Sequence, residues 1–144
     1  MRRTTLMLGL TLAVGIVLGA IGNQVLNAQQ QQPLKVTQLL KADIVGVDGK
    51  EALIRLVEFL PSGSSGKHHH PAHTFAYVME GSFTIEEEGK PPRTVRAGEV
   101  FQEVPGNVHE TKNLTGSPAK QLVFRVHPKG QPETTRITDR YFVK

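Results

Sequence analysis

The chain has 144 residues, a formal net charge of +4 and 38% hydrophobic residues, which together predict one globular domain. Two of its 17 basic residues and none of its 13 acidic residues fall in residues 1–28, so the remainder carries a net charge of only +2. No basic block with interleaved aromatic residues remains, which argues against a nucleic-acid partner. The chain has no cysteine, so disulfides are excluded and packing must supply the stability.

The first 28 residues have the pattern of an export signal and are set apart from the fold. Arg2 and Arg3 form a short positive region, Leu6 to Gly22 is an uncharged and mostly apolar run, and small or polar residues lead to Ala28. This order is typical of a secretory signal peptide cleaved after Ala28. The apolar run is also near the shortest that spans a bilayer, so an uncleaved N-terminal anchor is the alternative. Both interpretations predict a secreted or periplasmic domain, with membrane contact only if the segment is uncleaved.

Residues 29–42 are predicted as a leader, because a run of glutamines at 29–32 precedes Pro33. Within it, residues 34–40 fit a strand, with a helical turn as an equal alternative. From there to residue 130, short apolar or alternating segments recur between turn signals, which is the pattern of antiparallel β structure. The further predicted strands are 44–47, 52–60, 74–79, 82–87, 93–96, 100–104, 108–112 and 121–126. Residues 43–130 are therefore predicted to form an all-β barrel.

Glycine and proline mark the turns between these strands. Residues 61–66 form a loop rich in glycine and serine, Glu80-Gly81 predicts a tight hairpin, and residues 89–92 predict another turn. Roughly nine short strands at near-regular spacing predict a sandwich or a closed barrel. Residues 131–144 form a C-terminal tail, in which the apolar residues 141–143 predict a last segment packed on the barrel.

Four of the six histidines fall between residues 68 and 73, where the glycine loop gives way to a strand. In an extended chain residues i and i+2 point to the same side, so His68 and His70 share a face while His69 points the other way. Two imidazoles on one face can bind a divalent metal ion, but they bind it weakly. A third ligand is needed, and the pair alone leaves it open.

Two motifs make residues 51–127 resemble the cupin superfamily, specifically its small single-domain conserved-barrel members. His68 and His70 match the histidine pair of the first motif, and Gly81 matches its final glycine. The second motif matches, with its spacing, at Gly98, Gly106, His109 and Asn113. The resemblance implies a double-stranded β-helix, or jelly roll, and it implies that His109 is the third metal ligand.

The family's fourth metal ligand is a glutamate, and its place falls where this sequence has Thr74 and Phe75. Threonine is a poor replacement for an anionic oxygen ligand. Three alternatives fill the fourth place: Glu103, which precedes the turn that delivers the third histidine; His73, which precedes the vacant place; or an open, water-filled position. The predicted metal-site residues are therefore His68, His70, His73 and His109, with Glu103 as the candidate catalytic residue.

Other side chains are predicted to have structural roles. His127 is expected at a strand end on the surface, and residues 86–88, three glutamates, are expected to be a solvated charge run. Asn113 is expected to make a structural hydrogen bond in its turn. The aromatic residues expected to line the barrel are Phe75, Tyr77, Phe83, Phe101 and Phe124.

Imidazole ligands with one carboxylate suit divalent iron, manganese, nickel, copper or zinc, so the predicted cofactor is one divalent metal ion of open identity. With a redox-active ion, the resemblance implies dioxygenase-like chemistry on a small enol or aromatic substrate held in the barrel, with Glu103 as the base. One alternative is a non-catalytic module that binds a small ligand or a metal. Another is a redox-inert zinc or manganese isomerase or hydrolase. The predicted partners are a small molecule and, by family resemblance, a second copy in a homodimer.

Overall fold

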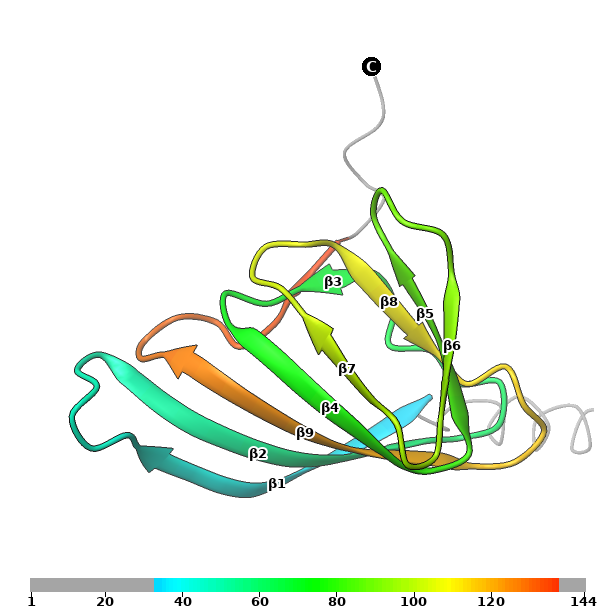
Figure 1. The fold of residues 1–144 in the computed structure, drawn as a ribbon, viewed down its shortest axis with the longest axis horizontal. Coiled ribbons are helices and arrows are strands. Elements are labelled where there is room, and N and C mark those ends of the chain that lie inside the picture. The colour runs from blue at the N-terminus through cyan, green and yellow to red at the C-terminus, as the bar shows by residue number, and fades with distance from the viewer. Residues whose placement is uncertain (1–32, 138–144) are drawn as a thin grey trace, which may run out of the picture. The chain divides into compact units, whose positions relative to one another are not determined.

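The computed structural model describes residues 33–137, which form ten strands (Figure 1). In chain order these are β1 (Leu34–Asp43), β2 (Lys50–Phe59), β3 (His68–His69), β4 (His73–Glu80), β5 (Ser82–Glu87), β6 (Arg93–Arg96), β7 (Val100–Glu103), β8 (His109–Lys112), β9 (Ala119–Pro128) and β10 (Thr135–Arg136). One antiparallel sheet has the order β1-β2-β9-β4-β7 and the other β10-β3-β8-β5-β6. The predicted all-β double-stranded β-helix is confirmed.

The described residues begin after the predicted signal segment and end before the predicted packed segment at 141–143, so both of these predictions lie outside them. Within residues 33–137 there is no helix with the length and apolar character needed to cross a membrane.

Strand β1 lies inside the stretch predicted as a leader. It pairs antiparallel with β2 along its length, from Leu34 opposite Phe59 to Asp43 opposite Glu51. The helical alternative for residues 34–40 is therefore wrong, and the sheet begins nine residues before position 43. Residues 44–47, predicted as a strand, form the turn to β2, because the chain adopts a positive φ of 79° at Gly46.

Glu80-Gly81 forms a corner between the two sheets and not the predicted hairpin. Strand β4 pairs with β7 and β9, whereas β5 pairs with β6 and β8 in the other sheet. Gly81 has a φ of +74°, and a Cβ there would lie 2.9 Å from the Cβ of Ala119, so the corner requires glycine. The hairpin of this region joins β5 to β6 across the predicted turn at residues 89–92.

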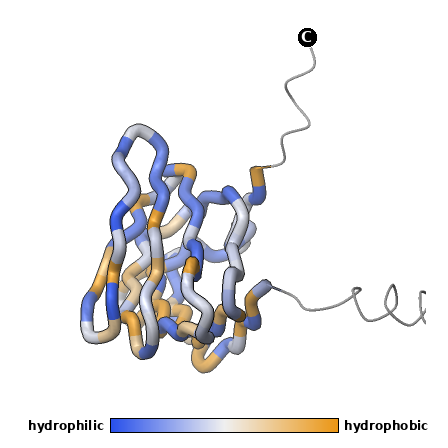
Figure 2. Tube along the Cα trace, turned by 90° about the vertical axis from the view of Figure 1, so that its right-hand side faces the viewer, coloured by the Kyte–Doolittle hydropathy of each residue, from blue (hydrophilic) through white to orange (hydrophobic). Residues whose placement is uncertain are grey.

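An apolar core fills one end of the space between the sheets, and Figure 2 shows hydrophobic segments gathered mostly toward the end drawn lowest. Phe59 and Phe83 meet edge to face with 5.0 Å between ring centroids. Such a pair adds roughly 0.5–1.5 kcal/mol to the effect of burial alone. The buried core residues are Val57, Phe59, Ala76, Val78, Phe83, Ile85, Val95, Phe101, Ala119 and Val123.

Phe83 and Phe101 line the barrel as predicted, but the other three aromatic residues do not. Phe75, Tyr77 and Phe124 point out of the first sheet and are 44%, 46% and 37% exposed. Strand alternation is the reason, because the even-numbered residues of β4 from 74 to 78 are the buried ones.

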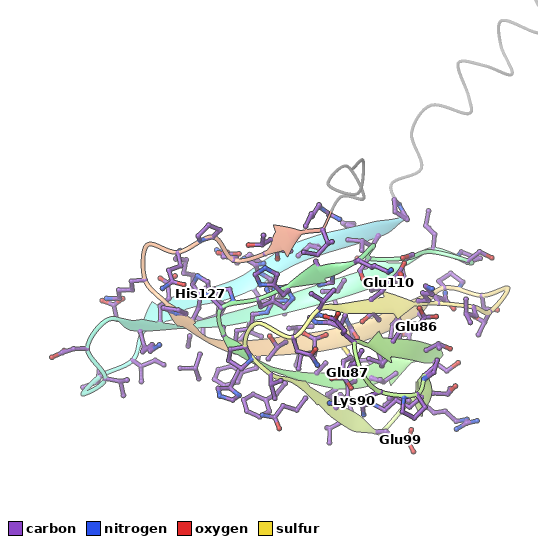
Figure 3. The ribbon with its side chains drawn as sticks, turned by 90° about the horizontal axis from the view of Figure 1, so that it is seen from above. Glu86, Glu87, Lys90, Glu99, Glu110 and His127 are labelled. Atoms are coloured by element: carbon purple, nitrogen blue, oxygen red, sulfur yellow. The ribbon has the colours of Figure 1, made fainter. Side chains whose placement is uncertain are left out.

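Three structural predictions have mixed outcomes. Asn113 is fully buried, and its side-chain amide donates hydrogen bonds to two backbone carbonyl oxygens at 3.0 and 2.8 Å, as expected. His127 is only 1% exposed, because it lies on the inward face of β9, so its predicted surface position is wrong (Figure 3). Glu87 is also buried, since it turns inward on β5 and accepts a hydrogen bond from Lys90 at 3.1 Å.

Candidate metal centre

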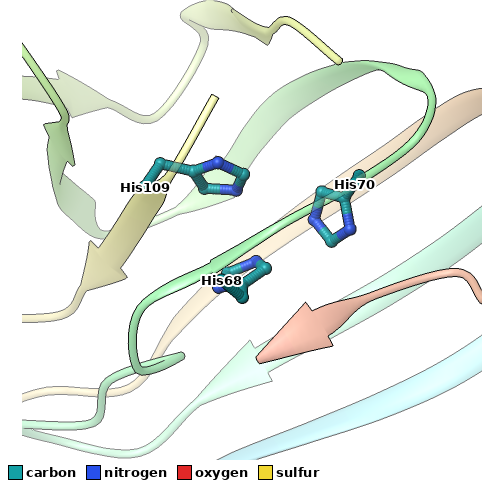
Figure 4. A group of neighbouring side chains, drawn as sticks. All are labelled: His68, His70 and His109. Atoms are coloured by element: carbon teal, nitrogen blue, oxygen red, sulfur yellow. The ribbon is translucent and has the colours of Figure 1, made fainter. Parts of the chain in front are cut away.

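Three histidines converge between the two sheets (Figure 4). His68 and His109 lie directly opposite each other in the β3–β8 pair, and His70 follows β3 on the way to β4. The ring centroids are 4.4 Å apart for His68 and His109, 4.7 Å for His68 and His70, and 5.2 Å for His70 and His109. All three side chains are buried, and one nitrogen of each lies within 4.8 Å of the others. The structure therefore brings together the three histidines selected from the sequence.

Backbone carbonyl groups fix the orientation of all three rings. The Nδ1 atoms of His68, His70 and His109 each lie 2.7–2.9 Å from a carbonyl oxygen. A carbonyl oxygen can only accept, so each Nδ1 carries a proton and donates it. In the neutral ring this leaves the lone pair, which a metal ion would need, on Nε2. The accepting carbonyl groups belong to Gly66, Glu133 and Asn107.

Glu103 places a buried carboxylate beside these rings. It lies directly opposite Thr74 in the β4–β7 pair, so the carboxylate comes from the strand next to the vacant ligand position. Its Oε1 is 3.3 Å from Nε2 of His109, and its Oε2 is 3.7 Å from Nε2 of His70. The residue is only 6% exposed, so its carboxylate has little contact with water.

His73 is not brought to the cluster. It precedes Thr74 in β4, so strand alternation turns its ring to the exposed side. Its Nδ1 lies 3.2 Å from the side-chain amide nitrogen of Gln102. Of the two side chains considered for the fourth place, the geometry favours Glu103, and the inclusion of His73 is corrected.

Burial and neighbouring charges set the protonation of the cluster. Burial, and then the charge of Arg125, lower the pKa of His70 to about 2, and burial also lowers the pKa of His68. Burial alone would lower the pKa of His109 as well, but the carboxylate of Glu103 outweighs it and the pKa is raised. Burial would raise the pKa of Glu103, yet His109 lowers it. The cluster thus combines two neutral imidazoles with one imidazole–carboxylate pair.

Buried polar atoms in this cluster have no partners of their own. Nε2 of His109 is buried and makes no hydrogen bond of good geometry although Oε1 of Glu103 is 3.3 Å away, and the buried Oε2 of Glu103 has no hydrogen-bond partner within the part of the chain that is described. Leaving such an atom unsatisfied costs about 1–3 kcal/mol. A divalent cation would satisfy both atoms, and three imidazole nitrogens with a carboxylate oxygen suit the first-row ions predicted from the sequence. The residues present therefore fit a divalent metal ion.

Sequence reasoning missed Arg125, which lies inside the barrel beside the cluster. It is opposite Thr74 in the β4–β9 pair and only 8% exposed. Its Nε donates a hydrogen bond to Oγ1 of Thr74 at 3.0 Å, and its Nη2 donates to Nε2 of His70 at 2.8 Å. Burial lowers the pKa of Arg125 to about 10, so it is charged at neutral pH. No signal in the sequence pointed to it, because hydrophobicity favours the opposite face of β9, whereas the structure turns residue 125 inward.

A cavity of about 100 Å³ adjoins the cluster. Its wall includes His68, His70, Glu103 and Arg125. This is several times the space that one water molecule needs. It is well below the roughly 300–1,000 Å³ of pockets for drug-sized ligands. The cavity therefore suits a molecule of a few heavy atoms.

Fold and site define the class of protein: a double-stranded β-helix with a histidine-rich centre between its sheets. Residues 55–125 match the family described as "Cupin domain". This match and the shared architecture of solved structures support the assignment of the chain to the cupin superfamily. The family match agrees with the resemblance inferred from the two motifs.

Several solved structures share the fold. An oxalate oxidase in complex with glycolate is 24% identical, with a TM-score of 0.58 over 75% of this chain and 57% of that one. The DMSP lyase DddQ from Ruegeria pomeroyi DSS-3 is 19% identical, with a TM-score of 0.59 over 72% and 51%. An uncharacterized conserved protein from Klebsiella pneumoniae is 14% identical, with a TM-score of 0.62 over 76% and 89%.

The chain thus spans little more than half the length of the first two of these proteins. At these identities the likeness shows the fold alone. No curated protein matches the sequence.

Proposed function

We propose that the protein is an exported, metal-dependent cupin enzyme in which His68, His70, His109 and Glu103 hold one divalent ion. The observation that carries the proposal is the group of three buried histidines with one nitrogen each within 4.8 Å. The carbonyl-bound Nδ1 atoms support it, because they leave the Nε2 atoms to face the ion. Export rests on the pattern of residues 1–28.

The side chains around the ion would have distinct roles. When bound, the ion supplies a Lewis acid for a substrate oxygen and, if it is redox-active, a centre for dioxygenase-like oxidation. Glu103 is the only carboxylate on the described cavity wall, and a bound cation would favour its ionised form. It can therefore accept a proton from a substrate hydroxyl as well as stabilise the ion. The apolar core closes the other end of the barrel to water.

The cavity bears on the size of the substrate. About 100 Å³ accommodates a small enol or a single small ring better than a multi-ring aromatic compound. We therefore place a small enol or enolisable molecule first among the substrates of a dioxygenase-like reaction.

A non-catalytic module that binds a small ligand is the second candidate. The observation that favours it is the hydrogen bond at 2.8 Å from Arg125 to Nε2 of His70, which competes with a metal ion for the same lone pair. A redox-inert zinc or manganese enzyme differs from both candidates, since it would bind metal and turn over without consuming oxygen.

The exposed aromatic residues support the proposal of a homodimer. Phe75 and Phe124 stack on the outer face of the first sheet with ring centroids 6.3 Å apart. Tyr77 on the same strand is 46% exposed. A second copy packed on this face would remove these rings from water.

Elemental analysis of protein purified without a tag tests the proposal. We expect about one transition-metal ion per chain in the wild type and in His73→Ala, the matched control for loss of a histidine outside the cluster. We expect little metal in His109→Ala and in the double variant His68→Ala/His70→Ala. Equal metal in all four proteins would refute the metal site. Oxygen uptake with small enols by the iron- or copper-loaded protein then separates the dioxygenase from the other two candidates.

A further inference from the structure

Positive charge gathers on the wall of the cavity beside the metal cluster. Three arginines, Arg55, Arg125 and Arg136, line it, against the single carboxylate of Glu103. Arg136 lies at the exposed side and donates to the backbone carbonyl of Ser65 at 2.9 Å. Arg55 and Arg125 belong to neighbouring strands of one sheet, β2 and β9, and are deeper than Arg136. The wall thus carries three positively charged side chains and one carboxylate.

Arg125 is a buried cation whose hydrogen-bond acceptors are all neutral. They are the hydroxyl of Thr74, the imidazole of His70 and, at 3.4 Å, the backbone carbonyl of Glu133. None of the ion pairs found in residues 33–137 involves Arg125. Burying a charge without a directly paired countercharge is unfavourable, so a bound anion would stabilise it.

Arg55 offers a second donor to the same cavity. Its guanidinium pairs with the carboxylate of Glu133, and its side chain is 15% exposed. The Nε of Arg55 is nevertheless buried and has no hydrogen-bond partner among the described residues. This unsatisfied donor and the absence of a direct ion pair to Arg125 among the described residues are two independent observations, and both favour an acceptor with negative charge.

We infer that this cavity binds a small carboxylate, whose oxygens accept hydrogen bonds from Arg125 and Arg55. The inference rests on the proposed function only in placing the anion beside a metal site. The planar guanidinium group presents its donors as a fork that matches the two oxygens of a carboxylate. A cavity of about 100 Å³ suits a ligand of a few heavy atoms, such as a short mono- or dicarboxylic acid.

Metal and carboxylate should bind cooperatively. Nε2 of His70 has one lone pair, which in this structure accepts the hydrogen bond from Arg125 at 2.8 Å. An ion held by His70 would take that lone pair and release the Nη2 donor of Arg125. The released donor then needs a new acceptor, and the ion adds positive charge next to it. Each ligand therefore favours the binding of the other.

Binding of propionate and of propionamide tests the inference, because the two molecules have nearly the same shape and only the first is charged. Both are titrated by NMR into metal-free and zinc-loaded protein, which requires no activity. We expect propionate to bind at least tenfold more tightly than propionamide, and zinc to increase that preference. Arg125→Gln should weaken propionate binding at least tenfold, equivalent to about 1.4 kcal/mol. Arg96→Gln, the same charge change at an exposed residue of β6 away from the cavity, should leave binding unchanged.

Arg125→Lys guards against loss of the fold, because it keeps the buried charge. It should bind propionate more weakly than the wild type, since the fork is lost. Equal binding of propionate and propionamide to the wild type, or equal binding of propionate by the Arg125 and Arg96 variants, would overturn the inference. If the protein binds no metal, the proposed function is refuted, but titration of the metal-free protein with propionate still tests whether the cavity binds a carboxylate. If metal binds and carboxylate does not, only the inference fails.

Discussion

Replacing Glu103 with glutamine removes the buried carboxylate of the metal cluster while keeping its size and planar shape. Oε1 of Glu103 lies 3.3 Å from Nε2 of His109. In the metal-free protein this is the distance of an ion pair with protonated His109, and two unit charges at that distance attract each other by about 5 kcal/mol at an effective dielectric constant of about 20. A divalent ion held in place of that proton would be attracted by the same carboxylate. The cost of burying the carboxylate offsets much of this attraction. We therefore expect Glu103→Gln to weaken metal binding by about 10–100-fold, or about 1.4–2.8 kcal/mol.

Competition with a chromophoric chelator measures this change, with His73→Ala as the control for a polar side chain outside the cluster. The metal-free protein gives a second measurement by NMR titration of the ring protons of His109. Without the carboxylate, burial is the main remaining influence, so the pKa of His109 should fall. A folded Glu103→Gln protein that binds metal as tightly as the wild type, with an unchanged pKa of His109, would refute the role given to this carboxylate.

Three further predictions follow from burial and charge. Metal content should be the same in His73→Ala and the wild type by elemental analysis, because the ring of His73 is exposed outside the cluster. In urea unfolding, Phe83→Ala should cost about 3–5 kcal/mol, since its side chain is fully buried, whereas Phe124→Ala, 37% exposed, should cost less than about 2 kcal/mol. In the metal-free protein the pKa of Glu103 is lowered and that of His109 is raised, so the pairing of the two groups contributes its full stabilisation between pH 4.5 and 6.5, the ordinary pKa values of the two side chains. Denaturation curves measured across pH give the difference in free energy of unfolding between the wild type and Glu103→Gln. This difference should decrease when the pH rises through the raised pKa of His109 and when it falls through the lowered pKa of Glu103.

The predictions that succeeded depended on local patterns. Alternation of short segments between turn residues is enough to indicate antiparallel strands, because side chains in a strand have a period of two. The same period places His68 and His70 on one face. His109 required the resemblance to a known motif, since the β3–β8 register that sets it opposite His68 is a long-range contact.

The predictions that failed depended on choices made by the whole fold. A glycine with positive φ suits both a hairpin and a corner, so Gly81 could not reveal that β4 and β5 join different sheets. In β9, hydrophobicity suggests that Phe124 points inward and Arg125 outward, but the structure has the reverse. The interior of the barrel at this end holds a polar site, so the polar residue of β9 is buried and its apolar neighbour is exposed, which inverts the usual pattern.

That inversion gives Thr74 a clear physical role. Across three neighbouring strands, Thr74 lies between Arg125 on β9 and Glu103 on β7. A glutamate at position 74 would stand within reach of the Arg125 guanidinium, whose Nε is 3.0 Å from the threonine hydroxyl, and would neutralise it. With threonine there, the carboxylate of the cluster comes from the next strand, and Arg125 keeps a charge with only neutral acceptors. Threonine at position 74 therefore accounts both for the origin of the cluster's carboxylate on β7 and for the absence of an ion pair to Arg125 among the described residues.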